Sequence, residues 1–311
     1  MSGGFGRRAR LGVMVLLWSL LALGCATPPM MHSSGIEIFT DQGAPLNAAQ
    51  ALVMLRNADH VLLGEVHDNP VHHRERAALV KALADSRPTV VFEQFARSAD
   101  AALAAPVDGD LQAWLDRAGF DSQGWAWPLH RPVIEAALAA KLRLRGGNLE
   151  RDEVSQIARQ GAGAAPADLL ARLAQPLPTA AVQALDEGLL DGHCGQLPAA
   201  ALPGMRAAQS ARDAAMADAL LRAGADGAMP TVLIAGNGHV RRDHGVPLWL
   251  ARAKPAAKVV SVGFLEIDAD GRPPSVAERV LYDLVWITPR QARPDPCAGF
   301  TLPPKTAPAT P

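Results

Sequence analysis

The sequence has no excess of charge of either sign. It holds 30 Lys and Arg residues against 31 Asp and Glu, which gives a formal net charge of −1. This balance gives no electrostatic reason to expect a nucleic acid or an acidic polymer as a partner. Tyrosine is nearly absent, with Tyr282 as the single copy, and no internal repeats are visible. With 49% hydrophobic residues, the 311-residue chain can still bury a core, in one large domain or two small ones.

A long membrane-spanning run is also missing. The apolar stretch Leu11–Leu23 is too short to cross a bilayer comfortably, and it follows a basic segment, as in a secretory signal. The residues Ala-Leu-Gly-Cys that end at Cys25 resemble a lipobox. We therefore predict that residues 1–25 are a lipoprotein signal peptide, that Cys25 is acylated, and that residues 26–35 are a tether. The alternative is an ordinary signal peptide with an incidental cysteine.

The strand candidates point to an α/β fold. Continuous apolar runs at Val61–Glu65, Thr89–Phe92 and Thr231–Ala235 are separated by helical segments, and such runs are typical of a parallel sheet covered on both faces. We predict one α/β domain over residues 36–287, with a mostly parallel central sheet and helices on both faces. A helical insertion or lid is expected at about residues 150–225. The Pro-rich segment 288–311 is expected to be a disordered tail.

Polar residues follow three of these predicted strands. Glu65 and His67 follow the first, Glu93 ends the second, and His239 follows the third after a Gly-Asn-Gly turn. Because ligands bind at the carboxyl ends of parallel strands, we expect these side chains to meet. Glu and His together suit either a divalent metal such as Zn or Mn, or acid–base catalysis. Each residue taken alone is more often a cap, an ion-pair partner or a hydrogen-bonded core residue.

The helix predicted from Met205 carries a second clue. Gln209 and Arg212 fall at helical spacing within a mostly apolar stripe, with Asp213 beside them. An unpaired buried arginine is costly, so Arg212 should meet Asp213, a site carboxylate or a ligand acid. The alternative is a structural Arg–Glu pair that orients Glu65 or Glu93.

Two further loops carry candidate ligands. His193 and Cys194 are candidates for soft metal or haem ligands, against the alternative of a turn with an incidental histidine. An exported protein could pair Cys194 with Cys297, and a free buried cysteine is the alternative. The remaining candidates follow His239 and suit an anionic group such as a propionate, with a solvated charged face as the alternative. They are Arg241, Arg242 and His244.

Taken together, several segments resemble the ChaN-like haem-binding lipoprotein family of the Tiki/TraB and erythromycin-esterase-like superfamily. These segments are LLGEVHDNPVHH, VVFEQF, RGGNLERDEV, DGHCGQLP, MRAAQSARDAAMADAL and IAGNGHVRRDHGVP. The resemblance implies an exported protein, anchored in the outer or inner membrane and facing the periplasm, that serves haem or iron uptake. It also implies a homodimer enclosing haem and a partnership with haem receptor or transport components.

The superfamily motif falls on Glu65, His67, Glu93 and His239, positions that carry metal or catalysis in hydrolytic relatives. Haem in the family is held by a tyrosine, and only Tyr282 is present here. His130 and His244 stand where relatives are expected to have an aromatic residue. The resemblance thus suggests His239 or His244 as the iron ligand, Arg241 and Arg242 as propionate partners, and a polar floor that includes Gln209 and Arg212. The rival function is a metal-dependent or acid–base hydrolase that uses the four motif residues.

Overall fold

The computed structural model describes Met1 and residues 35–300. The predicted signal peptide, Cys25, most of the tether and residues 301–311 lie outside this range. The central feature is an eight-stranded sheet, in the order β2-β1-β8-β7-β3-β6-β4-β5. Its strands are β1 (Glu37–Thr40), β2 (Pro45–Leu46), β3 (His60–Leu63), β4 (Thr89–Ala96), β5 (Arg143–Asn148), β6 (Thr231–Ile234), β7 (Val259–Glu266) and β8 (Leu284–Thr288).

Six neighbouring strands of this sheet, from β8 to β5, run parallel, and β1 and β2 extend it antiparallel at one edge. The predicted mostly parallel α/β sheet is therefore confirmed. The main strands are buried along their whole length, as the continuous apolar runs indicated.

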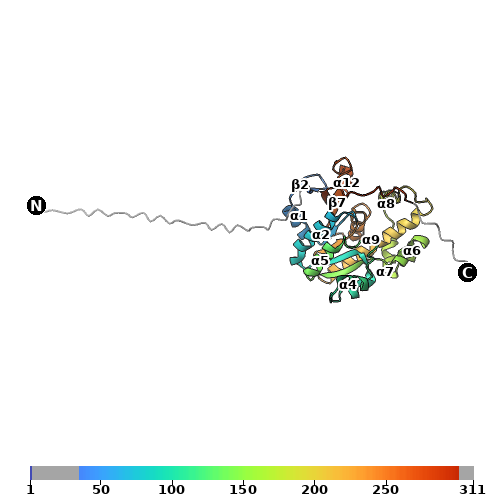
Figure 1. The fold of residues 1–311 in the computed structure, drawn as a ribbon, viewed down its shortest axis with the longest axis horizontal. Helices are drawn as coiled ribbons and strands as arrows, with labels where there is room; N and C mark the ends of the chain where they lie inside the picture. The colour runs from blue at the N-terminus through green and yellow to red at the C-terminus, as the bar shows by residue number, and fades with distance from the viewer. Residues whose placement is uncertain (2–34, 301–311) are drawn as a thin grey trace. The chain divides into compact units, whose positions relative to one another are not determined.

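Helices cover both faces of the sheet. The chain moves along the sheet in one direction from β3 to β5 and returns through β6 and β7 to β8. Because parallel crossovers are right-handed, this reversal places the outgoing and returning helices on opposite faces. Figure 1 shows α1, α2 and α5 grouped apart from α6–α9. The outgoing helices are α1 (Ala48–Arg56), α2 (Pro70–Leu83), α3 (Asp100–Leu103), α4 (Leu111–Arg117) and α5 (Arg131–Ala139).

The returning side is built around α9 (Leu202–Ala225), which joins β5 to β6 and packs on α11 (Val246–Ala253). The predicted insertion corresponds to α6 (Arg151–Gln160), α7 (Ala167–Leu173) and α8 (Thr179–Gly192), which pack on α9. Helix α9 itself is the crossover between the two strands. The short helices α10 (Asn237–Val240) and α12 (Val276–Arg279) complete the returning side.

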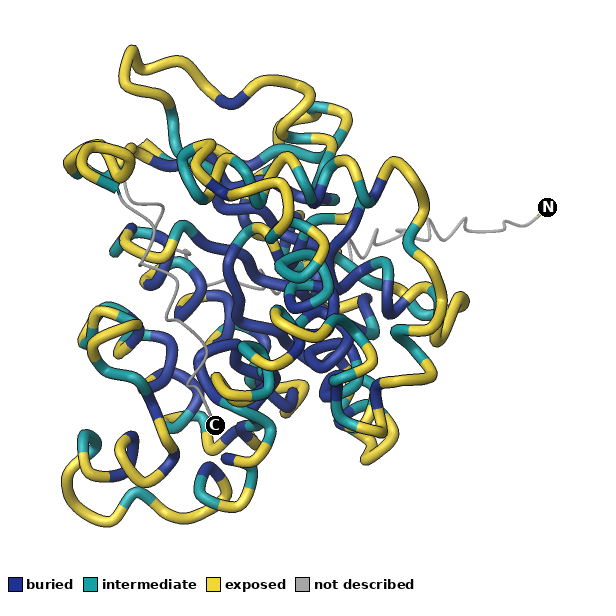
Figure 2. The backbone as a smooth tube through the Cα atoms, turned by 90° about the vertical axis from the view of Figure 1, so that its right-hand side faces the viewer, coloured by how far each residue is buried: buried dark blue, intermediate teal, exposed yellow. Residues whose placement is uncertain are grey.

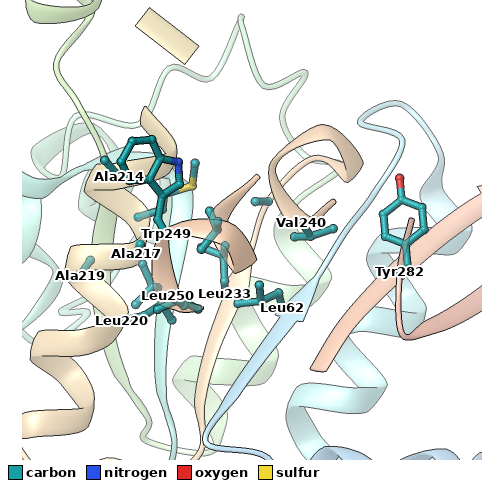
Figure 3. Close-up of a cluster of buried hydrophobic side chains, with 14 of the residues drawn as sticks. Leu62, Ala214, Ala217, Ala219, Leu220, Leu233, Val240, Trp249, Leu250 and Tyr282 are labelled. Carbon is teal, nitrogen blue, oxygen red and sulfur yellow. The ribbon is translucent and has the colours of Figure 1, made fainter. Parts of the chain in front are cut away.

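Buried residues gather along the sheet and the inner helix surfaces (Figure 2). One core cluster joins α9, α11 and the sheet through side chains such as Leu62, Leu220, Leu233 and Trp249 (Figure 3). Tyr282 lies at one side of this cluster, 4% exposed. A Cβ at Gly263 would come within 2.6 Å of its ring, so the glycine is what lets the ring lie against β7.

The beginning of the expected tail is held to the domain. Arg293 donates to Glu266 at 2.7 Å and to Asp68 at 2.6 Å. Cys297 forms a disulfide with Cys194, with the two Cα atoms 5.6 Å apart. Residues 289–300 therefore follow the surface of the domain, because an ion-pair network and a covalent bond fix them. The disulfide settles the two open alternatives for Cys194.

Among the described residues, no helix is both long and apolar enough to cross a membrane.

Candidate functional site

Three adjacent strands bring the predicted motif residues to one edge of the sheet. Strands β3, β6 and β4 are neighbours, and Leu63 and Phe92 both pair with Ile234 in parallel register. The residues just beyond these pairs are therefore close in space. Glu65 and His67 lie beyond β3, Glu93 lies within β4, and His239 lies in α10 after β6. The structure brings all four together in two linked clusters.

The first cluster is centred on Glu65, whose side chain is fully buried. His67 donates from Nδ1 to Glu65 Oε1 at 2.7 Å, and His130 Nε2 lies 3.2 Å from the same oxygen. His73 Nδ1 lies 3.2 Å from Oε2, which the guanidinium of Arg76 also contacts. His73, His130 and Arg76 are buried, whereas the side chain of His67 is 51% exposed. His67 is thus the member of this cluster that solvent reaches.

The second cluster surrounds Glu93. Arg212 Nη2 donates to Glu93 Oε1 at 2.6 Å, and the backbone N–H of Gly236 donates to Oε2 at 2.7 Å. His239 lies between two carboxylates, with Nε2 3.2 Å from Glu93 Oε1 and Nδ1 2.6 Å from Asp213 Oδ1. Arg212 therefore forms the Arg–Glu pair with Glu93, one of the two arrangements left open by the sequence.

The charges of this second cluster are fixed by their neighbours. Although burial opposes a charge, Glu93 and Asp213 raise the pKa of His239 to about 9. Burial likewise opposes the anion at Glu93, but His239 and Arg212 hold the pKa of that carboxyl well below its usual value. At neutral pH, His239 is an imidazolium and Glu93 is a carboxylate.

Gly236 joins the two clusters. A Cβ at this position would lie 2.9 Å from Cε1 and from Nε2 of His67, and 3.7 Å from Glu93 Oε2. The missing side chain lets the exposed imidazole approach the Glu93 carboxylate. By contrast, a Cβ at Gly238, two residues later, would meet nothing within 4 Å. In the motif Gly236-x-x-His239, the glycine thus leaves room for His67, and the histidine contacts Glu93.

Other predicted ligands fall at the border of this site or outside it. Gln209 Nε2 lies 3.2 Å from Nδ1 of His239, so it belongs to the polar floor. His244 is buried, and its Nδ1 has no hydrogen-bond partner among the described residues. His193 donates to the carbonyl of Leu189 at 2.7 Å, next to the disulfide.

The two arginines predicted to bind propionates pair with carboxylates of the chain itself. Arg241 binds Asp243 at 2.6 Å. Arg242 binds Asp41 and Asp283, each at 3.1 Å, and Asp283 precedes the start of β8, at the opposite end of that strand from the carboxyl edge.

The sequence places His73 on the first turn of the helix that follows Glu65 and His67, but Arg76 was missed. Arg76 lies three residues after His73 on α2, so the two share one helix face. The available signal was an arginine that helical spacing places on the same face as Leu79, Val80 and Leu83. Trp125, with its ring centroid 5.2 Å from that of His67, lies in a loop before α5 and carried no such signal.

The three residues whose possible metal-ligand atoms lie close together are not the ones that the sequence predicted. One atom each of Glu65, His73 and His130 lie within 4.8 Å of one another, and all three residues are buried. The predicted set of Glu65, His67, Glu93 and His239 is instead divided between the two clusters.

The sequence matches, over residues 51–250, the model of a family described as haem-binding uptake, Tiki superfamily, ChaN. The chain belongs to this family. A solved ChaN of Campylobacter jejuni, described as binding haem cofacially, is similar in structure. The TM-score is 0.68 and the identity 20%, over 84% of this chain and 99% of the other.

A mutant erythromycin esterase in its open conformation is more distant. Its TM-score is 0.42 at 17% identity, over 83% of this chain and 84% of the other. None of the curated proteins matches the sequence.

Proposed function

We propose that this chain is an exported, lipid-anchored haem-binding protein of haem or iron uptake, and that His67 is its iron ligand. Membership of a haem-binding family supports haem as the ligand. The assignment rests on the exposure and the hydrogen bonds of His67. Its side chain is half exposed, Nδ1 is held by Glu65 at 2.7 Å, and Nε2 has no hydrogen-bond partner among the described residues.

Such an imidazole suits haem iron. A carboxylate that accepts the Nδ1 proton fixes the tautomer and orients the ring, so the lone pair is left on Nε2. Histidine is an ordinary axial ligand of haem iron, so His67 would hold the iron through Nε2. Trp125, partly exposed beside His67, offers an aromatic surface to a porphyrin.

The other candidate ligands fit less well. Both ring nitrogens of His239 contact carboxylates, and His244 is buried. Tyr282 packs on Gly263 within the core, and burial raises the pKa of its hydroxyl above the usual value. His67 is therefore preferred over the residues that the resemblance suggested. Arg241 and Arg242 would have to exchange their present carboxylate partners to hold propionates.

Export and anchoring rest on other features. The basic and apolar N-terminal segment and Cys25 support a lipoprotein signal. The Cys194–Cys297 disulfide is typical of an oxidising compartment such as the periplasm. A membrane-anchored protein on the periplasmic side, forming a homodimer around haem and exchanging it with receptor or transport components, is the arrangement that we propose.

A haemin titration tests the iron ligand. We expect the Soret band of haemin to shift on binding to the wild-type chain. In His67→Ala the affinity for haemin should fall at least about 10-fold, because even the loss of a residue that only supports a metal ligand costs that much. His193→Ala, which alters a histidine beside the disulfide, is the control and should bind as the wild type does. Equal binding by His67→Ala and wild type would contradict the assignment.

A second function is supported by the contrast between the two histidines. Desolvation and nearby cations lower the pKa of His67, whereas that of His239 is raised to about 9. A neutral imidazole beside a charged one can act as base and acid in hydrolysis, with Glu65 and Glu93 as their partners. Turnover in an esterase and peptidase screen, abolished by His67→Ala without added haem, would favour this function.

A further inference from the structure

The helices on the two faces of the sheet differ in charge. Helices α1, α2 and α5, with the turns that follow α2 and α5, carry six exposed basic side chains against three carboxylates. The insertion α6–α8 carries three basic side chains against six carboxylates. Because the whole chain has a net charge of −1, this is a separation of charge rather than an excess. The exposed side of α1, α2 and α5 is called the basic surface; its basic residues are Arg56, Arg74, Lys81, Arg87, Arg131 and Lys141.

Most cations of the basic surface have no acidic partner. Arg131 pairs with Glu135 at 2.7 Å, and Arg56 donates to the backbone carbonyl of Ala82 at 2.9 Å. Within the described part of the chain, no salt bridge involves the other four, which are Arg74, Lys81, Arg87 and Lys141. Exposed cations that the chain itself does not pair leave this face able to attract anions.

A groove runs between α2 and α5 within the basic surface. It has a volume of about 640 Å³, and it is lined by the buried Ala77 and Ala136 and by Arg74, Lys81 and Arg131. Arg74 and Lys81 are seven residues apart on α2, so they lie on the same side of the helix, about 10 Å apart along its axis. Two cations at this separation can each contact a separate phosphate group, and the small alanines allow those groups to approach the helices closely.

Helix α1 adds exposed apolar side chains to the same surface. Val53 is 57% exposed and Met54 is 37% exposed. The bond from Arg56 to the carbonyl of Ala82, the residue after Lys81, joins the end of α1 to the end of α2. Apolar residues beside a set of cations are typical of a surface that lies among the headgroups of a membrane.

The proposed lipid anchor lies within reach of this surface. Glu37, at the start of β1, pairs with Ile287 near the end of β8, so the domain begins at the carboxyl edge of the sheet, where α2 also begins. Cys25 comes ten residues before Gly35, and ten residues span at most about 35 Å. Helix α2 has 14 residues and is about 21 Å long. A lipid on Cys25 therefore leaves enough chain for the whole of α2 to lie on the bilayer.

We propose that the basic surface is the face that this chain turns toward its membrane, and that its four unpaired cations bind the phosphate groups of anionic phospholipids. The inference rests on the proposed lipid anchor, which holds the domain near a bilayer but does not orient it. The acidic insertion α6–α8 lies apart from α1, α2 and α5 (Figure 1), and the same negative lipids repel it. The carboxyl edge of the sheet then faces sideways, so a ligand reaches His67 without crossing the membrane surface.

Vesicle binding by a chain that starts at residue 26, and so carries no lipid, tests the surface alone. We expect it to bind vesicles of equimolar phosphatidylglycerol and phosphatidylcholine but not vesicles of phosphatidylcholine, and to be released by high salt, which screens the attraction. Arg74→Gln combined with Lys81→Gln should weaken binding at least about 10-fold, because each basic residue at an anionic surface accounts for about 5-fold. Arg151→Gln combined with Arg159→Gln removes the same charge from α6, and this control should bind as the wild type does.

Lysine acetylation of the acylated chain in the same two kinds of vesicle reports its orientation. Lys81 lies on α2, and Lys254 is an exposed lysine that follows α11 on the returning side. We expect Lys81 to react about 5-fold more slowly in the anionic vesicles than in the neutral ones, and Lys254 to react equally in both.

Equal vesicle binding by the two double variants would overturn the proposal, as would slower acetylation of Lys254 in place of Lys81. The mass of the chain purified from membranes shows separately whether Cys25 carries a lipid. A chain without lipid would contradict the anchor, whereas loss of vesicle binding contradicts only the surface, so the two failures are distinguishable.

Discussion

The pair of carboxylates around His239 gives the sharpest prediction for stability. Replacement of His239 by Gln puts a neutral amide of similar size in place of the imidazolium, so the positive charge is removed. Glu93 keeps Arg212 at 2.6 Å, whereas Asp213 is fully buried and its Oδ2 already has no hydrogen-bond partner among the described residues. Breaking a buried pair from one side leaves an uncompensated charge and costs about 3–5 kcal/mol. We expect the free energy of unfolding of His239→Gln to fall by about 3 kcal/mol at pH 7.

The pH dependence gives an independent estimate. The pKa of His239 rises from 6.5 in the unfolded chain to about 9 in the folded protein. A raised pKa means that the folded state holds the proton more tightly, so the stabilisation is complete below pH 6.5 and is lost as pH rises through 9. Two to three pKa units correspond to about 3 kcal/mol. The stability difference between wild type and His239→Gln should therefore shrink between pH 7 and pH 10.

Urea unfolding at several pH values measures both effects. Asp213→Asn combined with His239→Gln is the matched control, because it removes the buried anion together with its cation and should restore at least about half of the loss. A cost below about 1 kcal/mol for His239→Gln, or a difference from wild type that does not change up to pH 10, would refute the reasoning.

Three further predictions follow from the same contacts. Gly236→Ala should displace His67, lowering stability by about 1–3 kcal/mol and weakening haemin binding, whereas Gly238→Ala should change neither; urea unfolding and the Soret titration measure these effects. Reduction or serine replacement of the Cys194–Cys297 disulfide, whose cysteines are 103 residues apart in sequence, should lower stability by up to about 4 kcal/mol in thermal melts. Acid should unfold the protein as pH falls from 6.5 towards 4, because three buried histidines have lowered pKa values and stay neutral in the folded state, so protons bind the unfolded chain first; circular dichroism follows this loss. These histidines are His72, His73 and His130.

The strand ends were predictable because two simple signals coincide there. Continuous apolar runs identify parallel strands, and the polar residues that follow them must reach the same edge, so the meeting of Glu65, Glu93 and His239 needed no tertiary information. The buried partners on α2 and α9 were harder to foresee. Helical spacing places Arg76 and Asp213 on inner faces, but which strand each face meets depends on the right-handed crossovers and their order.

The end of the helical insertion could not be predicted from the sequence either, because it depends on how α9 packs. Helix α9 is alanine-rich and looks continuous with the Ala-rich helices before it, yet it lies between the sheet and α6–α8 and is buried against both. Sequence periodicity cannot separate a crossover helix covered on two sides from an added helix, because small residues suit either environment.

The two histidines of the site differ in what a ligand would meet. His239 is enclosed, charged and already contacts two carboxylates, so it has no lone pair to offer. His67 is half exposed, and its proton is held on Nδ1 by Glu65, so its Nε2 carries the lone pair. Arg212 and His239 compensate Glu93, and Arg76 compensates Glu65, all within the chain. Under the proposed function, the edge of the sheet therefore offers haem iron a nitrogen donor beside an aromatic ring, whereas the propionates would have to draw cations away from carboxylates of the chain.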